Sequence, residues 1–161
     1  MSPLDIITHT PFWVWPVLAL LIVIGLKRTQ DRTVSAPRLV LMPLIILGLA
    51  GWNLAGLGGS LAAMAGLGLG IVAGTGAGLA LESRAGATQV RRGLVHLRGD
   101  WVSFFVLLAI FATRYVTTVV SIAAPTIAAG DVFHFVTALL SGFFAFLTLS
   151  RTGVRLRIAY A

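Results

Sequence analysis

Long apolar runs are the feature that most constrains how this chain can fold. Residues 39–57 and 61–81 contain no charged side chain, and hydrophobic residues make up 58% of the 161 positions, against 11% charged. A helix crosses about 30 Å of hydrocarbon with about 20 apolar residues, and lipid offers no partner to unpaired backbone groups. This composition excludes a soluble globular domain and predicts a polytopic membrane protein.

Hydropathy predicts five membrane spans, at about residues 11–26, 39–57, 61–81, 101–124 and 129–149. The expected fold is therefore all-α, a bundle of five transmembrane helices in one domain, residues 1–161. The N-terminal segment has Asp5, no Lys or Arg before the first apolar run and no small-residue cleavage site after it. We therefore expect the first span to be retained rather than removed as a signal peptide.

The basic residues predict the orientation. Eleven of the twelve Lys and Arg follow spans one, three and five, mostly in the loops 27–38 and 82–100. By the positive-inside rule the N-terminus is expected outside and the C-terminus in the cytoplasm. The net charge of +7 is then topological, and no nucleic-acid partner is expected. Loop 82–100 fits either a plain basic loop or a small hairpin around Arg92-Gly93, and this rim can also attract anionic lipids.

The third span carries a face of small residues at intervals of four. A helix with such a face lets another helix approach closely, which favours association in lipid. Three partners stay open: another helix of the same chain, a second copy in a homodimer, or a functional lining. The face is formed by the helix-packing residues Gly66, Gly70, Gly74 and Gly78, in line with Gly58 and Ala62, and ends at Glu82.

Arg114 is the twelfth basic residue and lies deep inside the fourth span. An arginine at the centre of a membrane helix costs about 2.5–3.5 kcal/mol, so it normally faces protein or water. Polar residues at helical spacing on spans four and five predict an outward-opening crevice between these antiparallel neighbours, with Arg114 at its floor. Its candidate binding residues are Arg114, Thr117, Thr118, Ser121, Asp131, His134 and Ser141. The alternative is that Arg114 and the hydroxyls only hold helices together.

Signatures of catalysis and cofactors are missing. The chain has no cysteine, no HExxH, no GxSxG and no paired carboxylates within a span. No enzyme activity, cofactor or metal is therefore predicted. Two functions stay open: binding or transport of a polar or anionic solute through the crevice, and a non-transport interaction or assembly role that uses the glycine face and the basic cytoplasmic rim.

Two segments carry a family resemblance. "GLKRTQDRTVSAPRLVLMPLIILGL" contains the pairs Arg28-Thr29 and Arg32-Thr33 and also Arg38 with Pro43, and "GDWVSFFVLLAIFATRY" contains Phe111, Arg114 and Tyr115. Together they resemble a domain-of-unknown-function family of small bacterial multi-span inner-membrane proteins. The resemblance implies a bacterial origin and the inner membrane, and it implies no activity.

Overall fold

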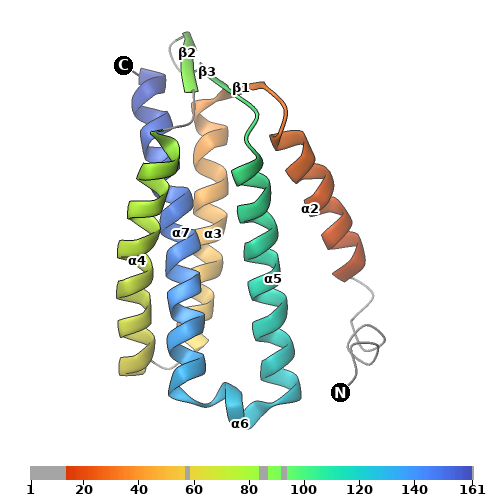
Figure 1. The fold of residues 1–161 in the computed structure, drawn as a ribbon, viewed down its shortest axis with the longest axis vertical. Coiled ribbons are helices and arrows are strands. Elements are labelled where there is room, and N and C mark those ends of the chain that lie inside the picture. The colour runs from red at the N-terminus through yellow and green to blue at the C-terminus, as the bar shows by residue number, and fades with distance from the viewer. Residues whose placement is uncertain (1–13, 57–58, 84–86, 92–93, 161) are drawn as a thin grey trace.

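The structure, a computed structural model, describes residues 14–56, 59–83, 87–91 and 94–160. A bundle of long helices carries a small sheet at one end, the strand end, and a short helix at the other (Figure 1). The helices are α2 (Val14–Arg28), α3 (Ala36–Gly56), α4 (Leu61–Glu82), α5 (Trp101–Ala123), α6 (Pro125–Ala128) and α7 (Asp131–Tyr160), and the strands are β1 (Arg32–Ser35), β2 (Ala87–Arg91) and β3 (Leu94–Leu97).

Within the described residues, four helices, α3, α4, α5 and α7, are long and apolar enough to cross a membrane. Their large apolar side chains point outward, as in Trp52, 84% exposed, and Leu61, 83% exposed. Such a surface suits contact with lipid rather than water. The predicted span 11–26 overlaps α2, which has 15 described residues and is not among these four; residues 11–13 lie outside the described part.

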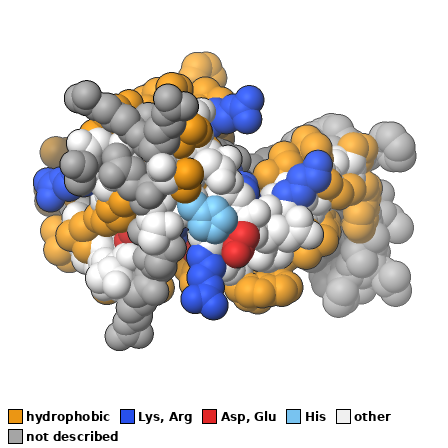
Figure 2. Space-filling view, turned by 90° about the horizontal axis from the view of Figure 1, so that it is seen from above, with side chains coloured by type: hydrophobic (Ala, Val, Ile, Leu, Met, Phe, Trp, Pro, Cys, Tyr) orange, Lys and Arg blue, Asp and Glu red, His pale blue; other side chains and the backbone are white. Residues whose placement is uncertain are grey.

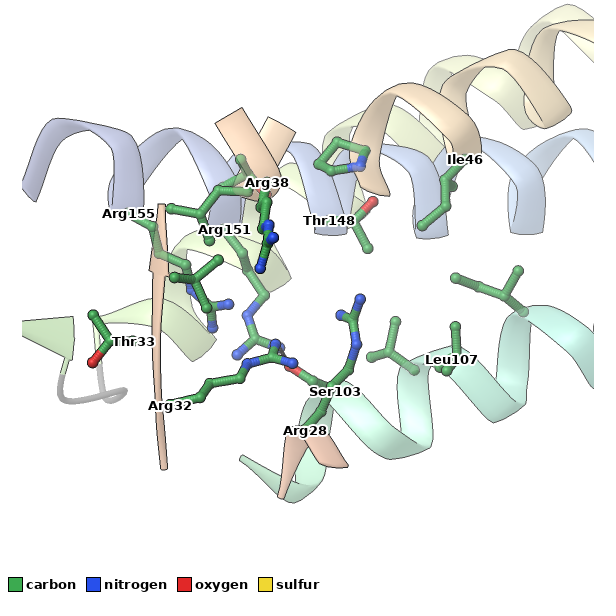
Figure 3. Close-up of a pocket in the computed structure, with 16 residues that line it drawn as sticks. Arg28, Arg32, Thr33, Arg38, Ile46, Ser103, Leu107, Thr148, Arg151 and Arg155 are labelled. Carbon is green, nitrogen blue, oxygen red and sulfur yellow. Dashed lines mark hydrogen bonds between the residues drawn. The ribbon is translucent and has the colours of Figure 1, made fainter. Parts of the chain in front are cut away.

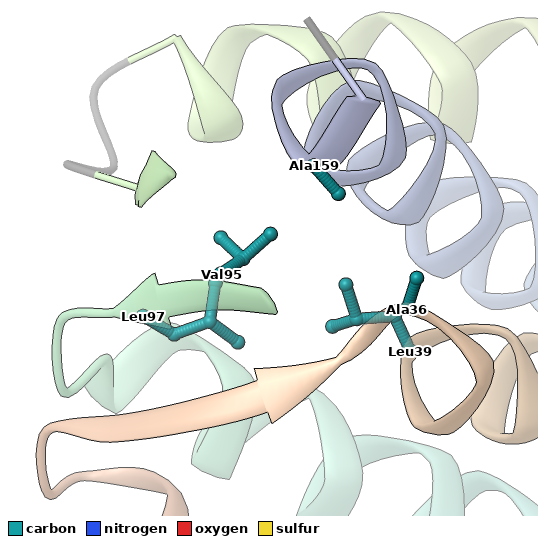
Figure 4. Close-up of a cluster of buried hydrophobic side chains, with 5 residues drawn as sticks. All are labelled: Ala36, Leu39, Val95, Leu97 and Ala159. Atoms are coloured by element: carbon teal, nitrogen blue, oxygen red, sulfur yellow. The ribbon is translucent and has the colours of Figure 1, made fainter. Parts of the chain in front are cut away.

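The strand end holds a small sheet. β2 and β3 lie within segment 82–100 and pair antiparallel, in agreement with the hairpin alternative; residues 92–93, expected at its turn, lie outside the described part. β1 lies within segment 27–38, where a loop alone was predicted. All neighbours are antiparallel, in the order β1-β3-β2. The last helix also continues past residue 149 to Tyr160. Val95 and Leu97 of β3 pack with Ala36, Leu39 and Ala159, joining the sheet to α3 and α7 (Figure 4).

The small-residue face of α4 lies against α7. Gly66, Gly70, Gly74 and Gly78 are buried, and a Cβ added at Gly70 or Gly74 would meet the backbone of Leu139 or Phe143. Backbones this close leave no room for a larger side chain at either position. In the described contacts this face is therefore filled by a helix of the same chain.

The helices associate in two groups. One contains α3, α4 and α7, and the other contains α2 and α5, which stand side by side in Figure 1. Within the second group the ring of Phe104 of α5 packs against Gly25 of α2, where a Cβ would clash with it. Helix α5 has no buried residue and touches α7 sparsely. Three cavities lined by described residues lie between these two groups.

Candidate functional site

A buried ion network joins three helices at the strand end. Arg151 of α7 donates through Nε to Glu82, the last residue of α4, at 2.9 Å, and through Nη2 to Asp100, the N-cap of α5. Arg155 donates through Nε to Glu82 at 2.6 Å. Glu82 is 3% and Arg151 5% exposed, so each buried charge is satisfied by an opposite one.

A cavity of about 310 Å³ opens beside this network; we call it the arginine cavity. Arg28 of α2, Arg32 of β1 and Arg38 of α3 converge on it, together with Arg151 and Arg155 (Figure 3). Among the described residues no carboxylate forms an ion pair with Arg28, Arg32 or Arg38, and Nε of Arg28 is buried without a hydrogen-bond partner. The cavity thus collects more positive charge than nearby carboxylates balance.

Backbone contacts hold the arginines in place. The amide of Asp100 donates to the carbonyl oxygen of Arg28 at 3.2 Å, and the amide of Gly99 donates to Oδ1 of Asp31 at 2.6 Å. These bonds fix the turn between α2 and β1 onto the start of α5. A view onto the strand end shows Lys and Arg side chains distributed across this face (Figure 2).

Two pKa shifts distinguish the unmatched charge of Arg32 from the matched charge of Asp100. Burial lowers the pKa of Arg32, and the nearby Arg155 lowers it further. Burial alone raises the pKa of Asp100, but hydrogen bonds and charge from Arg151, with smaller help from Val102 and Ser103, bring it below its usual value. An added anion would therefore relieve repulsion at Arg32, whereas the carboxylate of Asp100 is already matched.

One wall of the arginine cavity is apolar. In Figure 3 the arginines occupy one end, and Ile46 and Leu107 lie at the other. This wall comes from α3 and α5 and consists of Leu39, Pro43, Ile46, Val106, Leu107 and Ile110. The hydroxyl-bearing Ser103 and Thr148 line the same cavity. The site can therefore contact a charged group and an apolar one at once.

Arg114 has its own small cavity, of about 30 Å³, which is room for about one or two water molecules. Its Nη2 donates to the carbonyl oxygen of Leu49 on α3. Ser141 of α7 lines the same cavity, so the structure brings these two predicted site residues together. Arg114 thus faces α3 as well as α7.

The other predicted site residues are distributed differently. Thr117 donates to the carbonyl oxygen of Thr113 at 2.9 Å, and Ser121 to that of Thr117 at 2.8 Å, so both hydroxyls bond within α5. Thr118 is exposed. Nδ1 of His134 lies 3.4 Å from the Ser60 hydroxyl, at the start of α4.

A groove of about 650 Å³ lies at the α6 end; we call it the α6 groove. Thr117 and Asp131 line it among mostly apolar side chains from α5, α6 and α7. Neither Arg114 nor His134 is part of its lining. Five of the seven predicted residues therefore divide among the Arg114 cavity, the α6 groove and the Ser60 contact, and Thr118 and Ser121 belong to none of these.

The three cavities follow one another along the bundle. The arginine cavity and the Arg114 cavity share Ile46 and Ile110, and the Arg114 cavity and the α6 groove share Thr113 and Leu140. The series therefore runs between α5 and α7, with α3 lining its first two members, and the cavity at Arg114 is the smallest of the three.

Sequence reasoning treated Arg28, Arg32 and Arg38 as determinants of topology and missed their convergence. A signal was present in the imbalance between the many basic residues of these loops and the few acidic ones: Asp31, Glu82 and Asp100. Among the described residues no group of three or more His, Cys, Asp or Glu could hold a metal ion.

Comparison with known proteins identifies the family. A 42-residue segment is 43% identical to the uncharacterized protein PM0739 of Pasteurella multocida (strain Pm70), covering 26% of this chain. The chain thus spans about a third, 33%, of that relative's length. No solved structure matches the chain. Residues 2–161 match the family of unknown function DUF6622, in agreement with the resemblance in the sequence, and the protein belongs to this family.

Proposed function

We propose that this protein is a multi-pass protein of the bacterial inner membrane that binds an anionic solute in the arginine cavity, at its cytoplasmic end. The placement of the basic residues at the strand end supports an outside N-terminus and a cytoplasmic C-terminus. In this arrangement α2 belongs to a further span, the first along the chain, and the cavity opens toward the cytoplasm.

One observation carries the proposal: Arg28, Arg32 and Arg38 reach the same cavity from three elements without a described carboxylate partner. Gathering like charges in a partly buried space is unfavourable unless an anion joins them. Guanidinium groups suit carboxylate and phosphate because they donate two parallel hydrogen bonds. Glu82 and Asp100 do not fill this role, because they are already bonded to Arg151 and Arg155.

The test is anion binding by the purified protein in a nonionic detergent. We expect inorganic phosphate and a dicarboxylate, succinate, to raise the thermal unfolding temperature and to bind saturably in calorimetry. Arg32→Gln should weaken binding at least tenfold. The matched control is Arg157→Gln, an exposed residue of α7 that does not line the cavity. Absence of any anion effect on the wild-type protein, or equal losses in both variants, would reject the proposal.

Transport is a second candidate, and the serial cavities favour it. The sequence placed a route between spans four and five; the route we now propose runs between α3, α5 and α7, with Arg114 at its narrowest part. In this proposal Arg114 exchanges its bond with the Leu49 carbonyl oxygen for one with the passing anion.

Reconstituted liposomes test this route. We expect anion uptake that falls in Arg114→Gln, while binding at the arginine cavity persists. Arg114→Lys should retain the positive charge but lose the two-pronged recognition, so that uptake falls in part. Binding without any uptake would reject transport and leave the binding proposal in place. Absence of both anion binding and anion uptake would favour the interaction or assembly role. That role would use the basic rim, because α7 already covers the glycine face of α4.

A further inference from the structure

We propose that the anion held in the arginine cavity is the phosphate of an anionic lipid, whose acyl chain lies along the apolar wall of the same cavity. This inference rests on the proposed function and specifies its ligand. The chemistry it requires is one negatively charged phosphate joined to an extended apolar tail.

The lining of the cavity favours an amphiphile over a free anion. A small hydrated anion would be bound by Arg28, Arg32 and Arg38 and would gain nothing from the wall of Pro43, Ile46, Val106, Leu107 and Ile110. An acyl chain that lies along this wall shields it from water, which a hydrated anion cannot do. The division in Figure 3, with arginines at one end and apolar side chains at the other, matches the two parts of a lipid.

The depth of the cavity also fits a lipid. Trp101, 57% exposed, begins α5 directly after Asp100, and exposed tryptophans favour the level of the lipid headgroups. Ser103, one half-turn further, lines the arginine cavity, so the charged end lies at this level. Ile110 lies two turns deeper into α5, in the direction an acyl chain takes from its headgroup.

The space continues inward beyond the arginine cavity. Ile46 and Ile110 line both this cavity and the Arg114 cavity, so the apolar wall extends from the charged end toward the middle of the bundle. Basic pockets between membrane helices at the cytoplasmic side are known to suit anionic headgroups. Here Ser103 and Thr148 add hydroxyls next to the guanidinium groups.

The experiment compares three probes on delipidated full-length protein in a nonionic detergent: phosphatidylglycerol, phosphatidylcholine and inorganic phosphate. Binding is measured by native mass spectrometry and by the shift in unfolding temperature. We expect phosphatidylglycerol to bind at least tenfold more tightly than either other probe. Arg32→Gln should weaken the binding of phosphatidylglycerol at least tenfold, whereas Arg157→Gln should not.

A second pair of variants tests the tail. Ile110→Trp places a larger side chain against the apolar wall. It should weaken the binding of phosphatidylglycerol at least fivefold and leave the binding of inorganic phosphate unchanged. Ile122→Trp places the same side chain on an exposed part of α5, where Ile122 is 78% exposed, and should change neither. If Ile110→Trp fails to fold, shortening the lipid tail in dihexanoyl phosphatidylglycerol should produce the same loss with the wild-type protein.

The outcomes separate the two proposals. Equal affinity for inorganic phosphate and phosphatidylglycerol would overturn the lipid and leave the anion site standing. Equal affinity for phosphatidylcholine and phosphatidylglycerol would show that the headgroup charge is not recognised and would overturn the lipid proposal. Binding of none of the probes would overturn both.

Discussion

Glu82 and Arg151 lie 69 residues apart in the sequence and form a buried ion pair of 2.9 Å at the strand end. Glu82 ends α4 on the line of its buried glycines, so the pair holds together the same two helices whose backbones pack most closely. Arg151 also reaches Asp100, which starts α5. One guanidinium group therefore connects the ends of three helices.

Removing the negative charge of Glu82 should destabilise the fold. Glu82→Gln leaves Arg151 and Arg155 with one fewer buried carboxylate, and breaking a buried pair in this way costs about 3–5 kcal/mol. We expect a loss of this order in unfolding by sodium dodecyl sulfate, followed by tryptophan fluorescence. Arg157→Gln, which removes an exposed charge of the same helix, should change stability by less than about 0.5 kcal/mol. Equal stability of the Glu82 variant and wild type would contradict this.

Glycines two positions apart on α4 should differ in their tolerance. A Cβ at Gly74 would lie within 3.0 Å of the Phe143 backbone, whereas one at Gly76 meets nothing within 4 Å. Gly74→Ala should therefore lower the unfolding temperature by forcing α4 away from α7. Gly76→Ala should leave the unfolding temperature unchanged or raise it, because alanine restricts the unfolded chain and can add about 0.5–1 kcal/mol to the free energy of unfolding. The measurement is thermal unfolding of the two variants in parallel. Equal changes in unfolding temperature would contradict the close contact between α4 and α7.

Acid should weaken the strand end. The pKa of Asp100 is below its usual value, so its ionised form stabilises the fold; this contribution is complete above the unfolded pKa of about 3.9 and is lost as pH falls through the lower folded value. Unfolding temperatures measured from pH 6 to pH 3 should converge for wild type and Asp100→Asn at the acidic end. Asparagine retains the N-cap, which isolates the charge. A constant difference across this range would disagree with the lowered pKa.

Gly99 should matter for anion binding although it does not line the arginine cavity. A Cβ at this position would meet the carbonyl of Thr29 and the backbone of Gln30, in the turn between Arg28 and Arg32. Gly99→Ala should displace this turn and weaken phosphate binding about tenfold in calorimetry. Gly153→Ala, with open space on α7, should leave it unchanged. Unaltered affinity in the Gly99 variant would show that the turn does not position the arginines.

The sequence predicts the helical elements well because hydropathy is a local property. Residues 39–57 and 61–81 carry their own signal, and α3 and α4 occupy nearly the same positions. The end of α7 could not be read in this way. Arg151 and Arg155 resemble a cytoplasmic loop after a span, and only Glu82 and Asp100, contributed by other elements, allow them to remain in a buried part of a helix.

The site was harder to predict because its contacts are long-range. β1 pairs with β3 across about sixty residues, from Arg32 to Leu97, and no pattern in either segment specifies that register. Arg114 was recognisable as an anomaly, but its partner, the carbonyl oxygen of Leu49, is a backbone group that no residue type reveals. The helical spacing of the polar residues and the depth of Arg114 in its span predict that Arg114 faces protein or water, but they do not indicate which helix it faces.

The division of the helices into two groups makes the packing of the bundle uneven. The α3, α4 and α7 group is fixed by backbone-to-backbone packing and by the buried ion pair, whereas α2 and α5 touch it sparsely. All three cavities lie along the seam. Because few side chains interlock across this seam, widening a cavity here disturbs less packing than separating α4 from α7 would. The bundle therefore has its weakest lateral junction where its cavities lie.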